Sequence, residues 1–213
     1  MMKAPGAVAG LLLRALLWLL PVLGLWYLLR VPAVLPATWL AGQLMEALFP
    51  YWVRGTELAG TTQTLLTGLQ VRGARGLRGE LAPSTEVLVY AYGFPLLTAL
   101  LLASRARGLW WKLPAGYLAL LPVQAWGLCF TWLMQVAVLA GPETARQTYF
   151  GPIAVNLIGA AYQFGFLVLP TLAPVLLWLA LDRHVVASAL IEGALRAEVP
   201  AQEAPPPGYP SNR

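Results

Sequence analysis

The chain of 213 residues has few of the residue types from which catalytic and metal sites are usually built. It has one cysteine, Cys129, and one histidine, His184, which excludes an intrachain disulfide framework and a thiolate-rich metal site. The sequence also lacks a phosphate-binding loop, a dinucleotide fingerprint and an HExxH zinc motif. We therefore expect no metal and no cofactor.

Charge is scarce as well, since 11% of the residues are charged and 59% are hydrophobic. The mean hydropathy of +0.67 exceeds what a soluble core needs. Nine Trp and eight Tyr suit a protein with two lipid–water boundaries. The basic residues are scattered around the ends of apolar runs, so they indicate membrane orientation and membrane lipids as partners, with no nucleic acid. The composition predicts an all-α polytopic membrane protein.

Apolar runs predict the number of membrane crossings. About four transmembrane helices are expected, because a bilayer crossing needs ~20 apolar residues. They fall near 8–29, 87–104, 113–140 and 154–181. These spans define a membrane domain over 1–184. The remaining 185–213 form a tail, and its Pro-rich end is predicted to be disordered.

The segment 30–86, between the first two spans, predicts a small cap. Prolines flank a helix over 37–49, which is too short to span and is expected to lie in the interface or to re-enter the membrane. A small extracytoplasmic β-hairpin is predicted over 60–90, with strands near 61–71 and 78–90. The fold class is thus helical with one short interfacial helix and one hairpin.

Three arginines repeat at the tip of this predicted hairpin. Arg72, Arg75 and Arg78 each stand before a glycine. A basic, flexible tip of this kind is a candidate docking site for an acidic partner or for lipid headgroups. A solvated hairpin end explains the same pattern.

The loop after the second predicted span gives the orientation. Arg105, Arg107 and Lys112 lie close together there, and short basic loops remain in the cytoplasm. This places both termini in the cytoplasm and the 30–86 segment outside. The protein is expected in a bacterial inner membrane as a multi-pass protein.

Polar side chains follow one face of each of the last two spans. Gln124, Thr131 and Gln135 share a face of one helix, and Asn156 and Gln163 share a face of the other. Gln124 and Gln163 both fall near the midplane, so we expect their amides to pair between the helices. This polar seam is either a structural contact or a polar pocket for a peptide or lipid group.

Thiol chemistry is not expected. Cys129 lies ~24 Å along its span from the end that holds His184, and proton transfer needs a separation of ~3 Å. Aspartates are absent from the predicted spans, which disfavours an intramembrane aspartyl protease. We therefore expect no enzyme activity.

Three strings carry a family resemblance. VLVYAYGFPLLTALLLAS, LPVQAWGLCFTWL and AYQFGFLVLPTLAPVLLWLALDR resemble, in this order, the second half of the exosortase and archaeosortase family. Those proteins are membrane cysteine transpeptidases that process carboxy-terminal sorting tails on the outer face. The strings YAYGFPLLTALLLAS and LPVQAWGL are more similar to the exosortase H-associated membrane protein family, over roughly 8–184.

The resemblance lacks the catalytic residue types. Where the transpeptidases carry Cys-Ser-Gly, this chain has Ala91, Tyr92 and Gly93. Gln124 and Gly127 stand where an Asn and an Arg would lie, and Gln163 stands in the region of the catalytic His. The candidate junction motif is Tyr90, Tyr92 and Gly93.

This pattern implies a non-catalytic accessory subunit of an exosortase-type protein-sorting system. Such a subunit would contact the transpeptidase or its sorting-tail substrate. The alternative from another class is a small transporter or lipid-handling protein that uses the polar seam.

Overall fold

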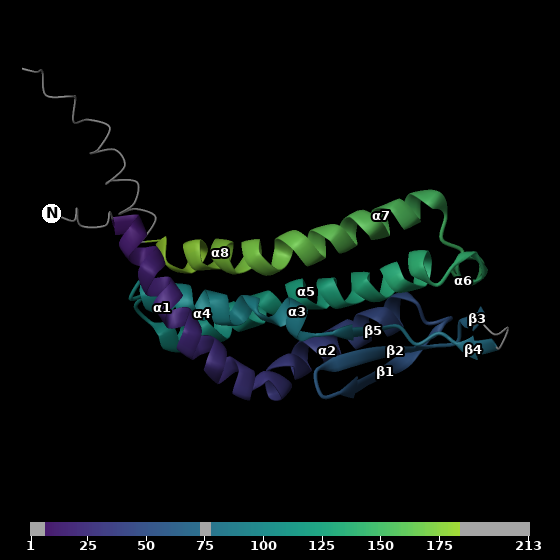
Figure 1. The fold of residues 1–213 in the computed structure, drawn as a ribbon, viewed down its shortest axis with the longest axis horizontal. Coiled ribbons are helices and arrows are strands. Elements are labelled where there is room, and N and C mark those ends of the chain that lie inside the picture. The colour runs from purple at the N-terminus through teal and green to yellow at the C-terminus, as the bar shows by residue number, and fades with distance from the viewer. Residues whose placement is uncertain (1–6, 73–77, 184–213) are drawn as a thin grey trace, which may run out of the picture.

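The computed structural model describes residues 7–72 and 78–183, and in it the chain is elongated (Figure 1). The helices are α1 (Ala7–Leu28), α2 (Arg30–Leu48), α3 (Leu88–Ala91), α4 (Gly93–Ala103), α5 (Leu109–Met134), α6 (Pro142–Thr148), α7 (Pro152–Gln163) and α8 (Leu169–Leu181). The π-helical segments are η1 (Gln135–Leu139) and η2 (Phe164–Val168). The strands are β1 (Val53–Ala59), β2 (Thr62–Thr67), β3 (Gln70–Arg72), β4 (Arg78–Glu80) and β5 (Ser84–Glu86).

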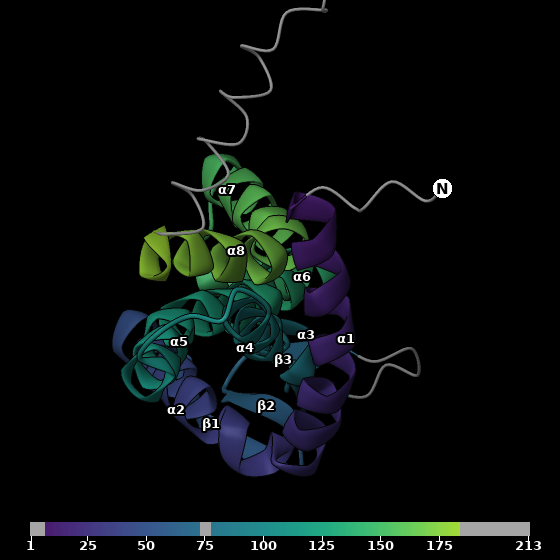
Figure 2. The ribbon, with the colours of Figure 1, turned by 90° about the vertical axis from the view of Figure 1, so that its left-hand side faces the viewer.

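One half of the molecule is a helical bundle. Seen from its end, α4 lies among α1, α5 and α8 (Figure 2). Leu97 and Leu101 of α4 are fully buried in this bundle. A side chain at Gly116 of α5 would overlap Leu97, so glycine at this position allows α4 and α5 to pack closely. The bundle core is therefore built around α4.

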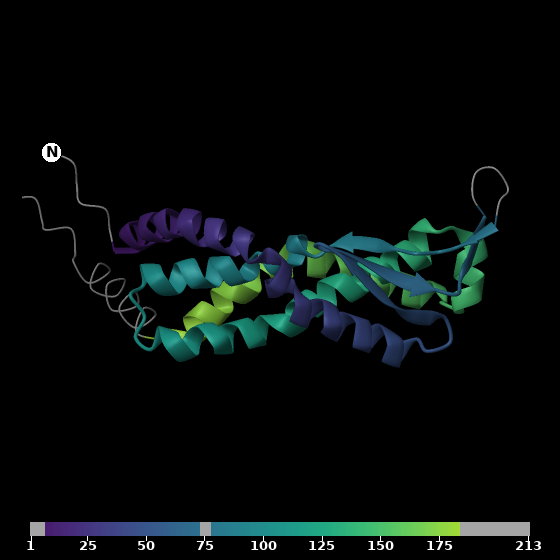
Figure 3. The same ribbon diagram turned by 90° about the horizontal axis from the view of Figure 1, so that it is seen from below.

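The other half holds α2 and the sheets beside the carboxy-terminal part of α5 (Figure 3). One antiparallel sheet has the strand order β1-β2-β5, and a second sheet pairs β3 with β4. The buried residues of α2 recur at helical spacing: Val34, Ala37, Thr38, Ala41, Gly42 and Met45. A Cβ at Gly42 would lie 2.9 Å from Thr56 Oγ1, so small residues on this face let α2 approach β1.

Within residues 7–72 and 78–183 three helices are of membrane length, where the sequence predicted about four spans. They cover Ala9–Leu28, Leu109–Leu139 and Pro152–Leu181. The predicted span 87–104 is a shorter apolar helix, Leu88–Ala103. Strand β5 ends just before it and the helix turns at Tyr92, so ~24 Å of helix is left.

The predicted helix 37–49 is too short. The structure shows α2 beginning at Arg30. Pro32 falls in the first turn, where a backbone N–H has no partner within the helix, and proline is tolerated there. Pro36 lies inside the helix. The predicted breaks at these two prolines were therefore wrong.

The segment predicted as one hairpin forms parts of two small antiparallel sheets. Its first strand, 61–71, is split into β2 and β3, and its second, 78–90, into β4, β5 and the start of α3. Strand β1 was not predicted, and it completes the larger sheet by pairing with β2. Arg75 and the tail 185–213 lie outside the described residues, and the division into a membrane domain and a tail stays a prediction.

Topology can be tested with single cysteines in a Cys129→Ala background. We expect Glu57→Cys, on β1, to react with a membrane-impermeant maleimide in intact cells. Arg107→Cys should react only after the inner membrane is permeabilised, because basic loops stay inside. Both positions are exposed, so side-chain burial does not limit labelling. The reverse pattern would place the sheets in the cytoplasm.

Candidate functional site

The site lies where the larger sheet meets the bundle, and Tyr90 is its centre. Strand β5 leads directly into α3, which places the Tyr90 side chain against α5. Tyr90 is 3% exposed. A Cβ at Gly127 of α5 would overlap the Tyr90 ring, so the ring fits only because this residue is glycine. The junction is thus filled by an aromatic side chain.

A chain of hydrogen bonds fixes the Tyr90 hydroxyl. It is bonded to Thr131 Oγ1, one turn further along α5. Thr131 Oγ1 donates its own proton to the Gly127 carbonyl at 2.7 Å. Because a hydroxyl has one proton to donate, Tyr90 is the donor to Thr131. Gly127 and Thr131 of α5 therefore fix the positions of the ring and the hydroxyl group of Tyr90.

The last helical segment closes the site from the other side. Phe166 of η2 meets the Tyr90 ring edge-on, with centroids 6.3 Å apart, and Tyr162 of α7 stacks on Phe166 at 5.8 Å. Gly165 permits close packing here, since a Cβ would lie 2.8 Å from Trp126 Cδ1. The junction, the carboxy-terminal third of α5 and the last helical segment meet at one place.

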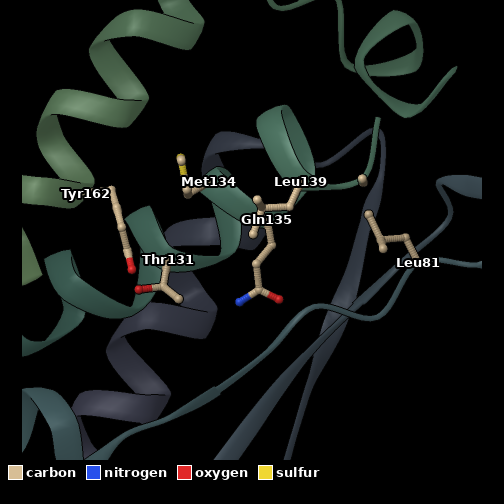
Figure 4. A pocket seen from close by; sticks show the side chains of 7 residues that line it. Leu81, Thr131, Met134, Gln135, Leu139 and Tyr162 are labelled. Atoms are coloured by element: carbon tan, nitrogen blue, oxygen red, sulfur yellow. The ribbon is translucent and has the colours of Figure 1, made fainter. Parts of the chain in front are cut away.

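A cavity of about 350 Å³ adjoins this cluster. Figure 4 shows Tyr162 reaching from α7 toward Thr131, with Gln135 to the right of Thr131. Gln135 Nε2 donates to the Ser84 carbonyl at 2.9 Å, which ties η1 to β5. The cavity is lined by Leu81, Thr131, Met134, Gln135, Leu139, Ala140 and Tyr162.

The predicted amide pair is not formed. Gln124 is buried, and its Oε1 has no hydrogen-bond partner within the described residues. Asn156 and Gln163 are exposed on α7. Thr131 and Gln135 of the predicted seam do lie together at the cavity. Residue spacing predicts which side chains share one face of a helix, but it does not give the rotation of α7 against α5.

The other predicted residues lie at two places. Tyr92 separates α3 from α4, and Gly93 opens α4, where a Cβ would lie 3.2 Å from the Pro170 carbonyl oxygen. Arg72 ends β3 and pairs with Arg78, which begins β4 and is exposed. Leu81, which lines the cavity, follows the β4 strand that begins with Arg78.

A polar cluster at the opposite end of the bundle was not predicted. Lys112 Nζ lies 3.6 Å from Asp182 Oδ1, and both side chains are more than nine-tenths buried. Ser104 Oγ donates to Asp182 Oδ2 at 2.6 Å and accepts from Trp178 Nε1 at 3.3 Å. The sequence does contain a signal for this pair. Lys112 stands just before the apolar run 113–140 and Asp182 just after the run 154–181, and these two ends meet when the helices pack antiparallel.

The residue types that bind metal ions are dispersed over residues 7–72 and 78–183. No group of three or more His, Cys, Asp or Glu side chains there is placed to hold a metal ion. Cys129 is buried, and its Sγ faces the Ala41 carbonyl of α2 at 3.7 Å. The thiol packs between α5 and α2.

The fold and this junction define a membrane protein with several candidate spans and a small antiparallel sheet at one end. The family model of the exosortase H-associated membrane protein matches residues 6–185. The chain belongs to this family, and its sequence resemblance is thereby confirmed. No curated protein and no solved structure matches the chain.

The hydrogen bond between Tyr90 and Thr131 can be measured by a double-mutant cycle. We expect Tyr90→Phe and Thr131→Val each to lower the free energy of unfolding by about 1 kcal/mol. The double variant should lose less than the sum, because the two changes remove the same bond. Unfolding in mixed detergent and SDS micelles gives these values. Strict additivity would show that the bond contributes nothing.

Cys129→Ala is expected to leave function intact. A small apolar group replaces another, so the free energy of unfolding should change by ~1 kcal/mol or less. The measurement is sorting of a tailed reporter in cells at matched membrane levels of the protein. An inactive variant at normal levels would contradict this and indicate a thiol enzyme.

Proposed function

We propose that this protein is a non-catalytic accessory subunit of an exosortase H protein-sorting system, and that it contacts the transpeptidase or its sorting-tail substrate. The family membership supports the association with exosortase H. The absence of catalytic activity and the subunit role are our inference from the junction.

One observation carries the proposal, namely the Tyr90 ring packed on Gly127. By resemblance to the transpeptidases, a catalytic Arg would occupy the place of Gly127 and a Cys the place of Ala91. Here the space beside position 127 holds an aromatic ring, and Ala91 is buried. By this resemblance the chain would keep the element order of a transpeptidase, with packed side chains in place of the reacting groups.

The exposed side of α7 is a suitable surface for the transpeptidase. Asn156 and Gln163 lie there together with exposed apolar side chains such as Leu157. Amides facing hydrocarbon lack hydrogen-bond partners, and a neighbouring membrane helix supplies them. We assign the contact with the transpeptidase to this side of α7.

The alternative of a transporter or lipid-handling protein rested on an amide seam between the last two spans. That seam requires Gln124 and Gln163 to share one polar surface. Gln124 is buried without a partner for its Oε1 among the described residues, while Gln163 is exposed. The amide pair, which was one part of the motivation for this alternative, is therefore absent, while Thr131 and Gln135 of the same polar seam line the cavity of about 350 Å³.

Co-purification in mild detergent tests the proposal. Tagged protein should retain the exosortase encoded in the same cells, and the Asn156→Leu, Gln163→Leu double variant should retain it roughly ten-fold less, as expected for the loss of two interhelical hydrogen bonds worth ~0.7 kcal/mol each. Gln43→Leu is the matched control, because it removes an exposed amide from α2. Absence of any association, together with normal sorting in a deletion strain, would refute the proposal.

A further inference from the structure

A second cavity lies at the end of the bundle opposite the sheets, and its volume is about 430 Å³. It is formed where α5 begins and α8 ends. Its polar lining consists of Arg107, Trp111, Lys112, Asp182 and Arg183. The cavity shares no lining residue with the one beside Tyr90.

Lys112 points to an anionic ligand. Its side chain is 8% exposed, and its ammonium group has three protons to donate. The Asp182 carboxylate is 3.6 Å away, beyond hydrogen-bond distance, and it already accepts a bond from Ser104. Within the described residues the Lys112 ammonium makes no hydrogen bond. The Lys112 ammonium therefore interacts with Asp182 through charge at 3.6 Å, and its N–H donors face a cavity in which a ligand can accept them.

The charged residues that line the cavity carry a net positive charge. Asp182 offsets Lys112, and the exposed side chains of Arg107 and Arg183 add two positive charges at the rim. One guanidinium group can donate two parallel hydrogen bonds to two oxygens of the same phosphate. Trp111 lines the same cavity with its indole ring partly exposed. The lining thus combines phosphate-binding cations with a ring suited to the lipid interface.

The cavity lies at headgroup level. Two of the membrane-length helices meet here, since Leu109–Leu139 begins and Pro152–Leu181 ends beside it. Trp110, next in the chain to Trp111, is 83% exposed, as expected for a ring in the interfacial belt. The basic loop that contains Arg107 assigns this end to the cytoplasmic leaflet by the positive-inside rule.

From these observations we infer that the cavity binds the phosphodiester headgroup of an anionic phospholipid of the inner leaflet. Lys112 donates to the phosphate from inside the cavity, and Arg107 and Arg183 hold it at the rim. Basic pockets between transmembrane helices at the cytoplasmic side bind such headgroups. The acyl chains would then lie along the apolar surfaces of α5 and α8.

Native mass spectrometry of the full chain in detergent tests this. Phosphatidylglycerol should be retained at least ~10-fold more tightly than phosphatidylcholine, and Arg107→Gln with Arg183→Gln should remove most of that preference. Both arginines are exposed, so the fold does not depend on them. Arg14→Gln is the matched control, because it removes an exposed positive charge from α1, outside the cavity lining.

Three outcomes would overturn the inference. Equal retention of the two lipids by the unmodified protein, which needs no variant, would show that the cavity does not select the anionic headgroup. An equal effect of Arg14→Gln would show that the attraction is general surface charge. Millimolar inorganic phosphate is added as a competitor of phosphatidylglycerol in the same experiment. If phosphate displaced the lipid and also raised the melting temperature of the protein as much as the lipid does, free phosphate would be the ligand.

Discussion

The contact between the Tyr90 ring and Gly127 is the constraint on which the arrangement of the chain depends. It fixes α3 on α5 at the point where the sheet gives way to the bundle. Since α3 is followed within two residues by Gly93, the same contact sets the start of α4, which forms the centre of the bundle. Phe166 brings the last helical segment to the same ring.

The two ends of the molecule, one with the sheets and one with the start of α5 and the end of α8, differ in the polar groups that they bury. Near Tyr90 the polar groups are neutral and bonded within the chain, through Thr131 and Gln135. At the other end Lys112 and Asp182 are charged and buried, at a separation that leaves the ammonium group available. Packing therefore accounts for the first end, and ligand chemistry is expected at the second.

The sequence predicted the elements that depend on apolar length and missed those that depend on contacts. The runs 113–140 and 154–181 were placed within a few residues, because a bilayer crossing has a fixed length. The predicted span 87–104 was placed within one residue of the apolar helix Leu88–Ala103, but this helix is shorter than the other three candidate spans among the described residues. Periodicity placed Gln124 and Gln163 on helix faces, but it cannot give the rotation between helices, so their pairing was wrong.

The most direct test of the account is the unfolding free energy of Gly127→Ala in mixed micelles. Because the new methyl group would overlap the Tyr90 ring, we expect a loss of about 1–3 kcal/mol. Tyr90→Ala should remove the clash. In a chain that carries Tyr90→Ala, we therefore expect Gly127→Ala to change the free energy of unfolding only slightly. A Gly127→Ala protein as stable as the unmodified chain would contradict the claim that this ring fills the junction.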